Sequence, residues 1–382
     1  MPAKKSYKWP EKHRILTWSG VAVDGAHSWA DLLQQDTGMK FQIGGDYNTV
    51  NRFRWLGRVG LSDQTIGAPS ETSQMVMADR KYAVRDGGPF QVRVVWMQSK
   101  GNAAFFTRGD SKIKTPYDIK PGTRITDMNP YAAATRVVEG LLAWAKVDPK
   151  EIQWVPVHNP EENIGAVVSG KADICFSFPI NPLIHEAAKN PLGLGIVETN
   201  AEKDPEGARR FREKDPLVNF GIIPEESLKA AGGKWGTQGL NLELTNERVD
   251  AELIYHIAKW LDENYDRYKD RHRENRFRTR FWLMKALEQT FVPAHEGLIA
   301  YLKDLKLWTD KHERRQQKNL ELLTRYCDDY QKLIWAADDA NIEVTPINEK
   351  WVRLWTEYRD AVLPPIKLFT SLDDEQMVGD IG

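Results

Sequence analysis

The chain has 382 residues, which is enough for more than one hydrophobic core. Its 53 lysines and arginines nearly balance its 54 aspartates and glutamates, and the net charge is −1. Without a basic excess, nucleic acid is excluded as an expected partner. No run of 18 apolar residues occurs, so the sequence predicts no membrane-spanning helix.

The first 110 residues alternate between strand-like and helix-like segments. A strand at 13–19 is followed by a loop at 20–26, and an amphipathic helix at 27–35 ends near Gly38. Ser70 is placed to cap a helix that runs to residue 79. The other predicted elements are strands at 39–43, 63–68, 91–97 and 103–107 and a helix at 49–56.

The segment 124–190 has the most regular pattern. It contains three predicted strands, and an Asn-Pro pair follows each of them and opens a helix, with Asn as the N-cap and Pro at the first helical position. The strands are at 124–128, 152–157 and 172–178, and the N-caps are Asn129, Asn159 and Asn181. Strands that alternate with helices at this spacing indicate βαβ units and a parallel sheet.

The remaining residues are predicted to be mostly helical. The charged segment 201–216 is interpreted as a surface excursion, and 218–223 as a strand before a glycine-rich loop or strand pair. Beyond 310, stripes of leucine, tyrosine and tryptophan indicate further helices, and the tail after Pro364 is expected to be extended or mobile. Helices are also predicted from residue 246, at 280–289 and at 293–305.

The strand–turn–helix junction at 124–136 has the features of an anion-binding site. Asn129 and Pro130 would leave free backbone N–H groups near Tyr131, Ala132 and Ala133, at the positive end of the helix dipole. Consecutive alanines let a ligand approach this backbone closely. We therefore predict a carboxylate site here, with further contacts from loops at the carboxyl ends of the other strands.

Signatures of catalysis and metal binding are missing from the sequence. It has no GxSxG, HExxH, Walker A or GxGxxG motif, and no pair of its eight histidines has metal-ligand spacing with a third ligand nearby. Its two cysteines, Cys175 and Cys327, are too far apart in the sequence to indicate a metal site. We expect a protein that is not an enzyme and that uses no metal or cofactor.

The start of the chain bears on its location. The first 15 residues, MPAKKSYKWPEKHRI, are basic but lack the apolar segment of a signal peptide. We expect a periplasmic protein whose signal peptide has been removed, with a cytoplasmic protein as the alternative.

Several stretches resemble the TAXI-type solute-binding proteins of tripartite ATP-independent periplasmic (TRAP) transporters. They are PYDIKPGTRIT, NIGAVVSGKADICFSFPINPLIHEAA, ERVDAELIYHIAKWLDENYD and VPAHEGLIAYLKDLKLW, and the likeness covers roughly residues 13–310. It implies an α/β, two-lobed type II periplasmic binding protein fold, here with a helical C-terminal extension. Lobe 1 would comprise 13–108 plus 218–310, lobe 2 would comprise 109–217, and the extension and tail 311–382.

The resemblance also implies a function. The protein would capture a small carboxylate-containing or zwitterionic solute, an organic acid or amino acid, by hinge closure, and deliver it to the membrane permease subunits of a TRAP transporter. Where the family has a turn of small residues, this chain has Pro130 and Tyr131, which predicts a ligand other than the family's glutamate. The expected ligand-binding residues are Trp18, Ser19, Asp24, Tyr47, Asn48, Ser70, Glu71, Asn129, Tyr131, Ala132, Ala133, Thr135, Phe178 and Asn181.

Two other functions stay open at this point. The first is an intracellular ligand-sensing or regulatory domain on the same fold, with the helices at 311–362 as its partner surface. The second is an enzyme on this fold, for which the sequence offers no nucleophile–base pair or metal constellation.

Overall fold

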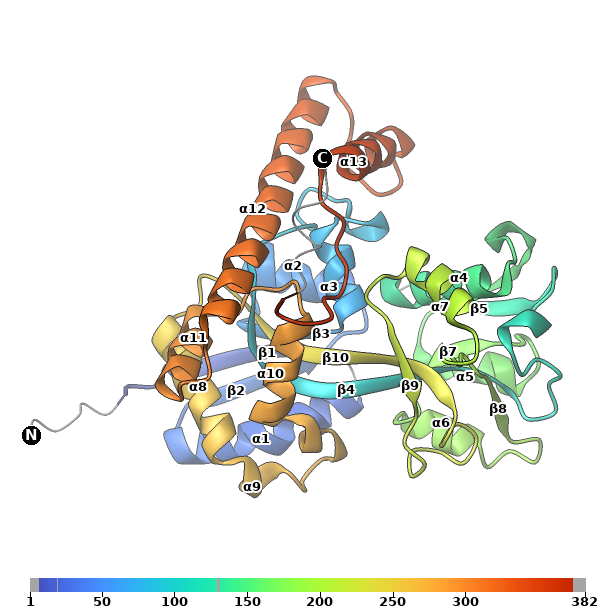
Figure 1. Cartoon of the computed structure of the whole chain (residues 1–382), viewed down its shortest axis with the longest axis horizontal. Coiled ribbons are helices and arrows are strands. Elements are labelled where there is room, and N and C mark those ends of the chain that lie inside the picture. Colours follow the sequence, from blue (N-terminus) through green and yellow to red (C-terminus); the bar gives the residue numbers. More distant parts are fainter. Residues whose placement is uncertain (1–6, 19, 129–130, 374–382) are drawn as a thin grey trace, which may run out of the picture.

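The computed structural model describes residues 7–18, 20–128 and 131–373. They form two lobes that lie side by side and are joined by two long strands (Figure 1). Each lobe has its own hydrophobic core, and the residues of the two cores come from different parts of the chain. The predicted α/β fold with two lobes is confirmed.

Lobe 1 is built on a mixed sheet in the order β2-β1-β3-β10-β4. β1, β2 and β3 are parallel, and β10 is antiparallel to both β3 and β4. The carboxyl ends of β1 to β3 therefore point towards lobe 2. The bounds are β1 (Lys12–Thr17), β2 (Lys40–Gly45), β3 (Gln64–Gly67), β4 (Val92–Arg108) and β10 (Trp235–Asn246).

The two strands that join the lobes differ from the predicted elements. We expected separate strands at 91–97 and 103–107, but β4 is continuous because Lys100 and Gly101 pair with Leu240 and Gly239 of β10. β10 itself was expected only as a loop or strand pair, since its glycines weaken strand propensity. Pairing with β3 or β9 on one side and β4 on the other overrides that local preference.

The helices of lobe 1 come from both halves of the chain. α1 begins at Val21, whereas 20–26 was predicted as a loop. Ala22, Ala26, Trp29 and Leu33 share one buried face, and this periodic burial extends the helix through the glycine-containing turn. The bounds are α1 (Val21–Thr37), α2 (Thr49–Arg54), α3 (Pro69–Val76), α8 (Ala251–Glu263), α9 (Tyr265–Tyr268), α10 (Arg280–Gln289) and α11 (Glu296–Asp304).

Lobe 2 collects the strands around the far halves of β4 and β10. It includes residues 218–231, which were expected in lobe 1, because Val218, Ile223, Leu228 and Ala231 belong to its core. β7 and β8 pair with β4, β9 pairs with β10, and β5 and β6 form a parallel pair. The strands are β5 (Arg124–Met128), β6 (Gln153–Val157), β7 (Cys175–Ser177), β8 (Leu194–Val197) and β9 (Asn219–Ile222). The helices are α4 (Ala132–Ala145), α5 (Pro160–Val168), α6 (Pro182–Ala187) and α7 (Pro205–Lys214), the last inside the expected surface excursion.

Two of the three predicted Asn-Pro caps are confirmed. The Asn159 side chain accepts a hydrogen bond from the Glu162 N–H, and the Asn181 side chain accepts one from the Leu183 N–H. At the third junction, Asn129 and Pro130 lie outside the described residues. Helix α4 begins at Ala132, with Tyr131 at its N-cap position and no side-chain cap, so it starts later than predicted.

The C-terminal extension packs onto lobe 1 and shares its core. It consists of α12 (Asp310–Asp339) and α13 (Glu349–Val362), which lie above lobe 1 in Figure 1. The indole N–H groups of Trp351 and Trp355 donate to the carbonyls of Ala83 and Met77, each at 2.8 Å. The tail was expected to be extended or mobile, but Ile366 is buried in the same core. No helix in the described part of the chain is long and apolar enough to cross a membrane.

Candidate ligand-binding site

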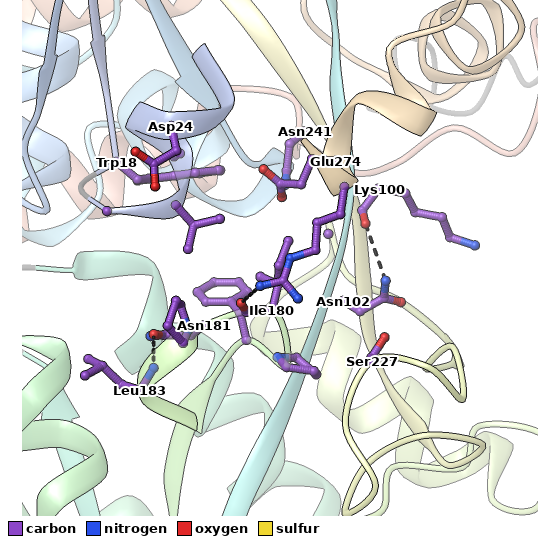
Figure 2. Close-up of a pocket in the computed structure, with 18 of the residues that line it drawn as sticks. Trp18, Asp24, Lys100, Asn102, Ile180, Asn181, Leu183, Ser227, Asn241 and Glu274 are labelled. Atoms are coloured by element: carbon purple, nitrogen blue, oxygen red, sulfur yellow. Dashed lines mark hydrogen bonds between the residues drawn. The ribbon is translucent and has the colours of Figure 1, made fainter. Parts of the chain in front are cut away.

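A cavity of about 420 Å³ lies between the lobes, beside the strands that join them (Figure 2). Lobe 1 contributes the turn after β1, the first turn of α1, and a short 3-10 helix that we call η5 (Arg273–Phe277). Lobe 2 contributes the loop after β5 and the loop between β7 and α6. The joining strands contribute Lys100, Gly101 and Asn102 from β4 and Asn241 from β10.

Much of the cavity wall is aromatic. Tyr131 and Phe178 of lobe 2 are in tilted contact, with ring centroids 6.4 Å apart. Trp18, Tyr47 and Phe277 of lobe 1 also line the cavity. Such walls bury the apolar body of an organic ligand, while a few polar groups fix its orientation.

Two arginines of η5 reach from lobe 1 to lobe 2. The guanidinium of Arg273 donates a hydrogen bond to the carbonyl oxygen of Ile180, and Arg276 forms an ion pair with Glu226 at 3.0 Å. Partial burial lowers the pKa of Arg273, which nevertheless stays protonated at neutral pH. No carboxylate in the described part of the chain forms an ion pair with Arg273, so its charge is available to a ligand.

A carboxylate stands next to this arginine. Glu274 is half-buried, and its Oε2 accepts a hydrogen bond from the Gln98 side-chain amide at 3.1 Å. Burial raises the pKa of Glu274. Asp24, in the first turn of α1, is exposed at the same end of the cavity, and Figure 2 shows it on the lobe 1 side with Glu274 and Asn241. The polar part of the site thus carries both signs of charge.

Six of the predicted ligand-binding residues line the cavity, two lie outside the described residues, and six lie elsewhere. Those in the lining are Trp18, Asp24, Tyr47, Tyr131, Phe178 and Asn181. Those outside the described residues are Ser19 and Asn129. Those away from the cavity are Asn48, Ser70, Glu71, Ala132, Ala133 and Thr135.

Glu71 and Ser70 were expected in the cleft, but both are buried. Glu71 forms an enclosed ion pair with Arg52 and accepts a hydrogen bond from the indole N–H of Trp18 at 3.2 Å. Ser70 donates to Asp215 of lobe 2 at 2.7 Å, and it is the second residue of α3, whose N-cap is Ala68, so it does not cap the helix. Their polar groups therefore face protein partners and do not reach the cavity.

The remaining predicted residues also have partners within the protein. Asn48 caps α2 by accepting a hydrogen bond from the Asn51 N–H, and Thr135 donates to Asp127 at 2.9 Å. Ala132 and Ala133 are buried. At the expected carboxylate site, Tyr131 occupies the N-cap position of α4 and is buried, and this burial raises its pKa well above the usual value. Of the described residues at this junction, Met128 and Tyr131 line the cavity.

The η5 arginines and Glu274 were missed in the sequence. The stretch DRHRENRFR reads as a charged surface run, because charge runs are usually solvated. The alternation of arginine with Glu274 and Phe277 is the local signal that distinguishes this stretch from an ordinary solvated run of charges. Lys100, Asn102 and Asn241 were missed because β4 and β10 were not expected to be continuous.

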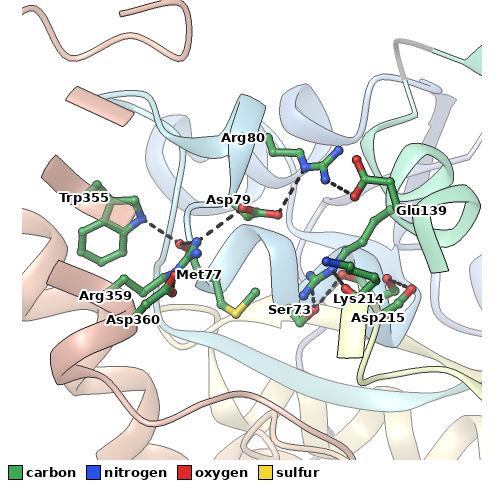
Figure 3. A network of polar contacts seen from close by, with 12 residues as sticks. Ser73, Met77, Asp79, Arg80, Glu139, Lys214, Asp215, Trp355, Arg359 and Asp360 are labelled. Atoms are coloured by element: carbon green, nitrogen blue, oxygen red, sulfur yellow. Dashed lines mark hydrogen bonds and ion pairs between the residues drawn. The ribbon is translucent and has the colours of Figure 1, made fainter. Parts of the chain in front are cut away.

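A second set of contacts joins the lobes away from the cavity (Figure 3). Arg80, after α3, forms an ion pair with Glu139 of α4. Asp79 lies within 4 Å of both Arg80 and Arg359 of α13, so polar contacts run from the C-terminal extension through lobe 1 to lobe 2. Arg80 has a positive φ of 52°, and this backbone conformation is uncommon for a residue other than glycine.

Fold and site together define a two-lobed α/β protein with a cavity between its lobes. Both lobes and both joining strands contribute to one cavity, so a bound solute would contact all of them. Among the described residues no group of three or more His, Cys, Asp or Glu side chains could hold a metal ion.

The sequence matches the model of the NMT1-like family over residues 38–305, and the chain belongs to that family. No curated protein is detectably similar to it in sequence. This match does not confirm the TAXI subtype that the sequence stretches had indicated.

Several solved structures resemble the chain at low sequence identity. A periplasmic sulfonate-binding protein, SsuA from Methylobacillus flagellatus, is 14% identical, with a TM-score of 0.46 over 78% of this chain and 95% of that chain. MatC from Rhodopseudomonas palustris with bound malate is 14% identical, with a TM-score of 0.44 over 84% of this chain and 100% of that one. The lactococcal protein OpuAC, complexed with glycine betaine, is 13% identical, with a TM-score of 0.40 over 84% and 99%.

Proposed function

We propose that this protein is an extracytoplasmic receptor that captures a small carboxylate-containing solute between its lobes and delivers it to a membrane importer. The observation that carries the proposal is Arg273, which reaches from lobe 1 to the Ile180 carbonyl of lobe 2 inside the cavity and has no carboxylate partner among the described residues. A guanidinium binds a carboxylate through two parallel hydrogen bonds.

The proposed mechanism is hinge closure rather than catalysis. The lobes are connected through β4 and β10, so bending of these strands would open the cavity to solvent. A solute that contacts Arg273 on one lobe and Asn181 on the other would favour the closed arrangement, because only that arrangement offers both contacts.

Mass spectrometry of the native protein tests the proposal. We expect purified protein to carry a small organic acid or amino acid, and to bind it again after unfolding, dialysis and refolding. A folded protein that retains no solute, and gives no heat with a panel of organic acids and amino acids, would contradict the proposal.

For the importer we propose a TRAP permease, on the strength of the sequence stretches that resemble TAXI-type proteins. Proteoliposomes that contain the permease and this receptor would take up the solute when a sodium gradient is applied. Uptake that requires ATP and no ion gradient would contradict the TRAP assignment. A native gene product found only in the cytoplasm would contradict the extracytoplasmic location.

A further inference from the structure

We infer that the cavity recognises the zwitterionic head of an amino acid with a large apolar side chain, and that Arg273 and Glu274 determine this specificity. The inference rests on the proposed function and narrows its ligand class. Arg273 would contact the carboxylate and Glu274 the ammonium group, while the aromatic walls would enclose the side chain.

Arg273 is the most suitable carboxylate partner in the cavity. Its hydrogen bond to Ile180 leaves most of its five N–H donors for a ligand. The other two cationic side chains of the lining have partners elsewhere. Arg276 forms an ion pair with Glu226, and the Lys100 ammonium lies 5.4 Å from the centre of the Trp282 ring, which is not part of the cavity lining.

Glu274 is the matching partner for an ammonium group. Its carboxylate receives a hydrogen bond from Gln98 but forms no ion pair with any described residue. Burial disfavours the charged form of this carboxylate, Arg278 and Arg273 oppose that effect only in part, and a ligand ammonium would relieve the remaining cost. The charge of Glu274 acts on Arg273 and opposes the lowering of its pKa, so a ligand that contacts both groups must carry its two charges close together, as an amino acid does on its α-carbon.

The charge of the cavity disfavours a dicarboxylate. The lining has four carboxylates and three cationic groups, and the ion pair of Arg276 with Glu226 removes one of each. A dicarboxylate would place two more negative charges beside Asp24, Glu161 and Glu274. A zwitterion leaves the balance of charge unchanged, so we expect the site to reject glutamate and succinate.

The apolar part of the cavity sets the side chain of the ligand. The lining includes the aromatic rings of Trp18, Tyr131, Phe178 and Phe277, and Ile180 and Leu183 add aliphatic surface. A small amino acid such as glycine would leave these walls uncovered. Phenylalanine and leucine fit a wall of this chemistry.

Isothermal titration with matched ligands tests the inference. Phenylalanine, leucine, glutamate and succinate are compared with 3-phenylpropanoate, which lacks the amine, and with phenethylamine, which lacks the carboxylate. We expect phenylalanine or leucine to bind at least about 10-fold more tightly than either one-charge analogue, since a charged hydrogen bond contributes about 1.5–3 kcal/mol.

Two variants assign the charges to their partners. Arg273→Gln is expected to weaken phenylalanine binding at least about 10-fold and to leave the weak binding of phenethylamine unchanged. Glu274→Gln is expected to weaken phenylalanine binding similarly and to leave 3-phenylpropanoate unchanged. Arg271→Gln, at an exposed residue of the same segment that lies outside the cavity lining, is the control and should bind like the wild type.

The outcomes separate this inference from the proposed function. Equal binding of 3-phenylpropanoate and phenylalanine, or tightest binding of succinate, would overturn the zwitterion inference but would support a carboxylate receptor. Loss of phenethylamine binding in Arg273→Gln would overturn the assignment of Arg273 to the carboxylate. A folded protein that binds none of these ligands, and carries no solute from its cells, would overturn both.

Discussion

Glu71 and Arg52 form a fully buried ion pair, and Glu71 also accepts a hydrogen bond from Trp18, which lines the cavity. Burial raises the pKa of Glu71, and the guanidinium of Arg52 opposes that effect. Arg52 also donates to the Ile66 carbonyl at 2.7 Å, so both charges are held by hydrogen bonds as well as by each other.

Removing one charge of this pair should destabilise the protein. We expect Glu71→Gln to lower the free energy of unfolding by about 3–5 kcal/mol, because Arg52 would remain buried without a counter-ion. Urea denaturation followed by circular dichroism measures this. Glu206→Gln, in an exposed ion pair with Arg209 on α7, is the control and should show no measurable change. A change of less than about 1 kcal/mol for Glu71→Gln would contradict the expectation, because changes of that size are common for point substitutions in general.

His295 gives the stability a pH dependence. Its side-chain Nδ1 accepts a hydrogen bond from the Gly297 N–H at the start of α11, and burial lowers its pKa below the usual 6.5. The unfolded chain therefore binds a proton first as the pH falls. The stability contributed by the neutral imidazole is complete above pH 6.5 and is lost as the pH falls towards the folded pKa.

His295→Asn keeps an N-cap acceptor and removes the titrating group. Below pH 6.5 we expect the wild type to lose stability faster than this variant, by at most about 1.4 kcal/mol per pH unit. Urea denaturation of both proteins at several pH values between 7.5 and 5 measures this difference. The other buried histidines contribute equally to both proteins, so their effect drops out of the comparison. Parallel pH profiles for the two proteins would contradict the prediction.

At the scale of elements, we expect the contact between the turn after α3 and helix α4 to stabilise the closed arrangement of the two lobes. Arg80 and Glu139 join the lobes there, while η5 joins them across the cavity. Opening the lobes would separate both contacts. Strain at Ala78 and Arg80, with φ values of 42° and 52°, is offset by the contacts of this turn with α13.

Glu139→Gln should shift the protein towards its open form. We expect a larger radius of gyration in small-angle X-ray scattering and faster dissociation of a bound solute by a few-fold. The free energy of unfolding should change by less than about 1 kcal/mol, because both side chains are partly exposed. Asp338→Asn, which removes an exposed pair with Arg85 within lobe 1 and its extension, is the control. Unchanged scattering and dissociation would show that the pair does not influence closure.

At the scale of the whole molecule, the C-terminal extension is a structural part of lobe 1. Trp351 and Trp355 are fully buried, and α12 residues such as Tyr330 belong to the same core as Trp96 in β4. A partner surface, one of the alternatives that the sequence left open, could involve only the outer face of these helices.

Trp351→Ala should therefore destabilise lobe 1 by about 3–5 kcal/mol, because it leaves a large cavity in the shared core. Trp335→Ala is the matched control, since Trp335 is in the same extension and is 60% exposed. Hydrogen exchange measured by mass spectrometry should show faster exchange in lobe 1 and unchanged exchange around Leu141 in the lobe 2 core. Equal effects of the two tryptophan variants would contradict this account.

The sequence by itself determined the elements that local rules control. The bounds of β5 and α10 agree with the predicted 124–128 and 280–289, and the caps at Asn159 and Asn181 are formed as expected. Periodicity and capping act within a few residues, so they can be read without knowing the fold. The order of these elements indicated βαβ units, and the resemblance to the TAXI family implied the two lobes.

Only the tertiary structure decided which residues face the cavity. Glu71 was expected to contact a ligand, but it is buried in an ion pair with Arg52. Arg273 resembled part of a solvated run of charges, but its side chain reaches the opposite lobe. β4 continues through Gly101 because β10 pairs with it. The physical reason is the same in each case: the deciding partner lies far away in the sequence, and no local pattern records its position.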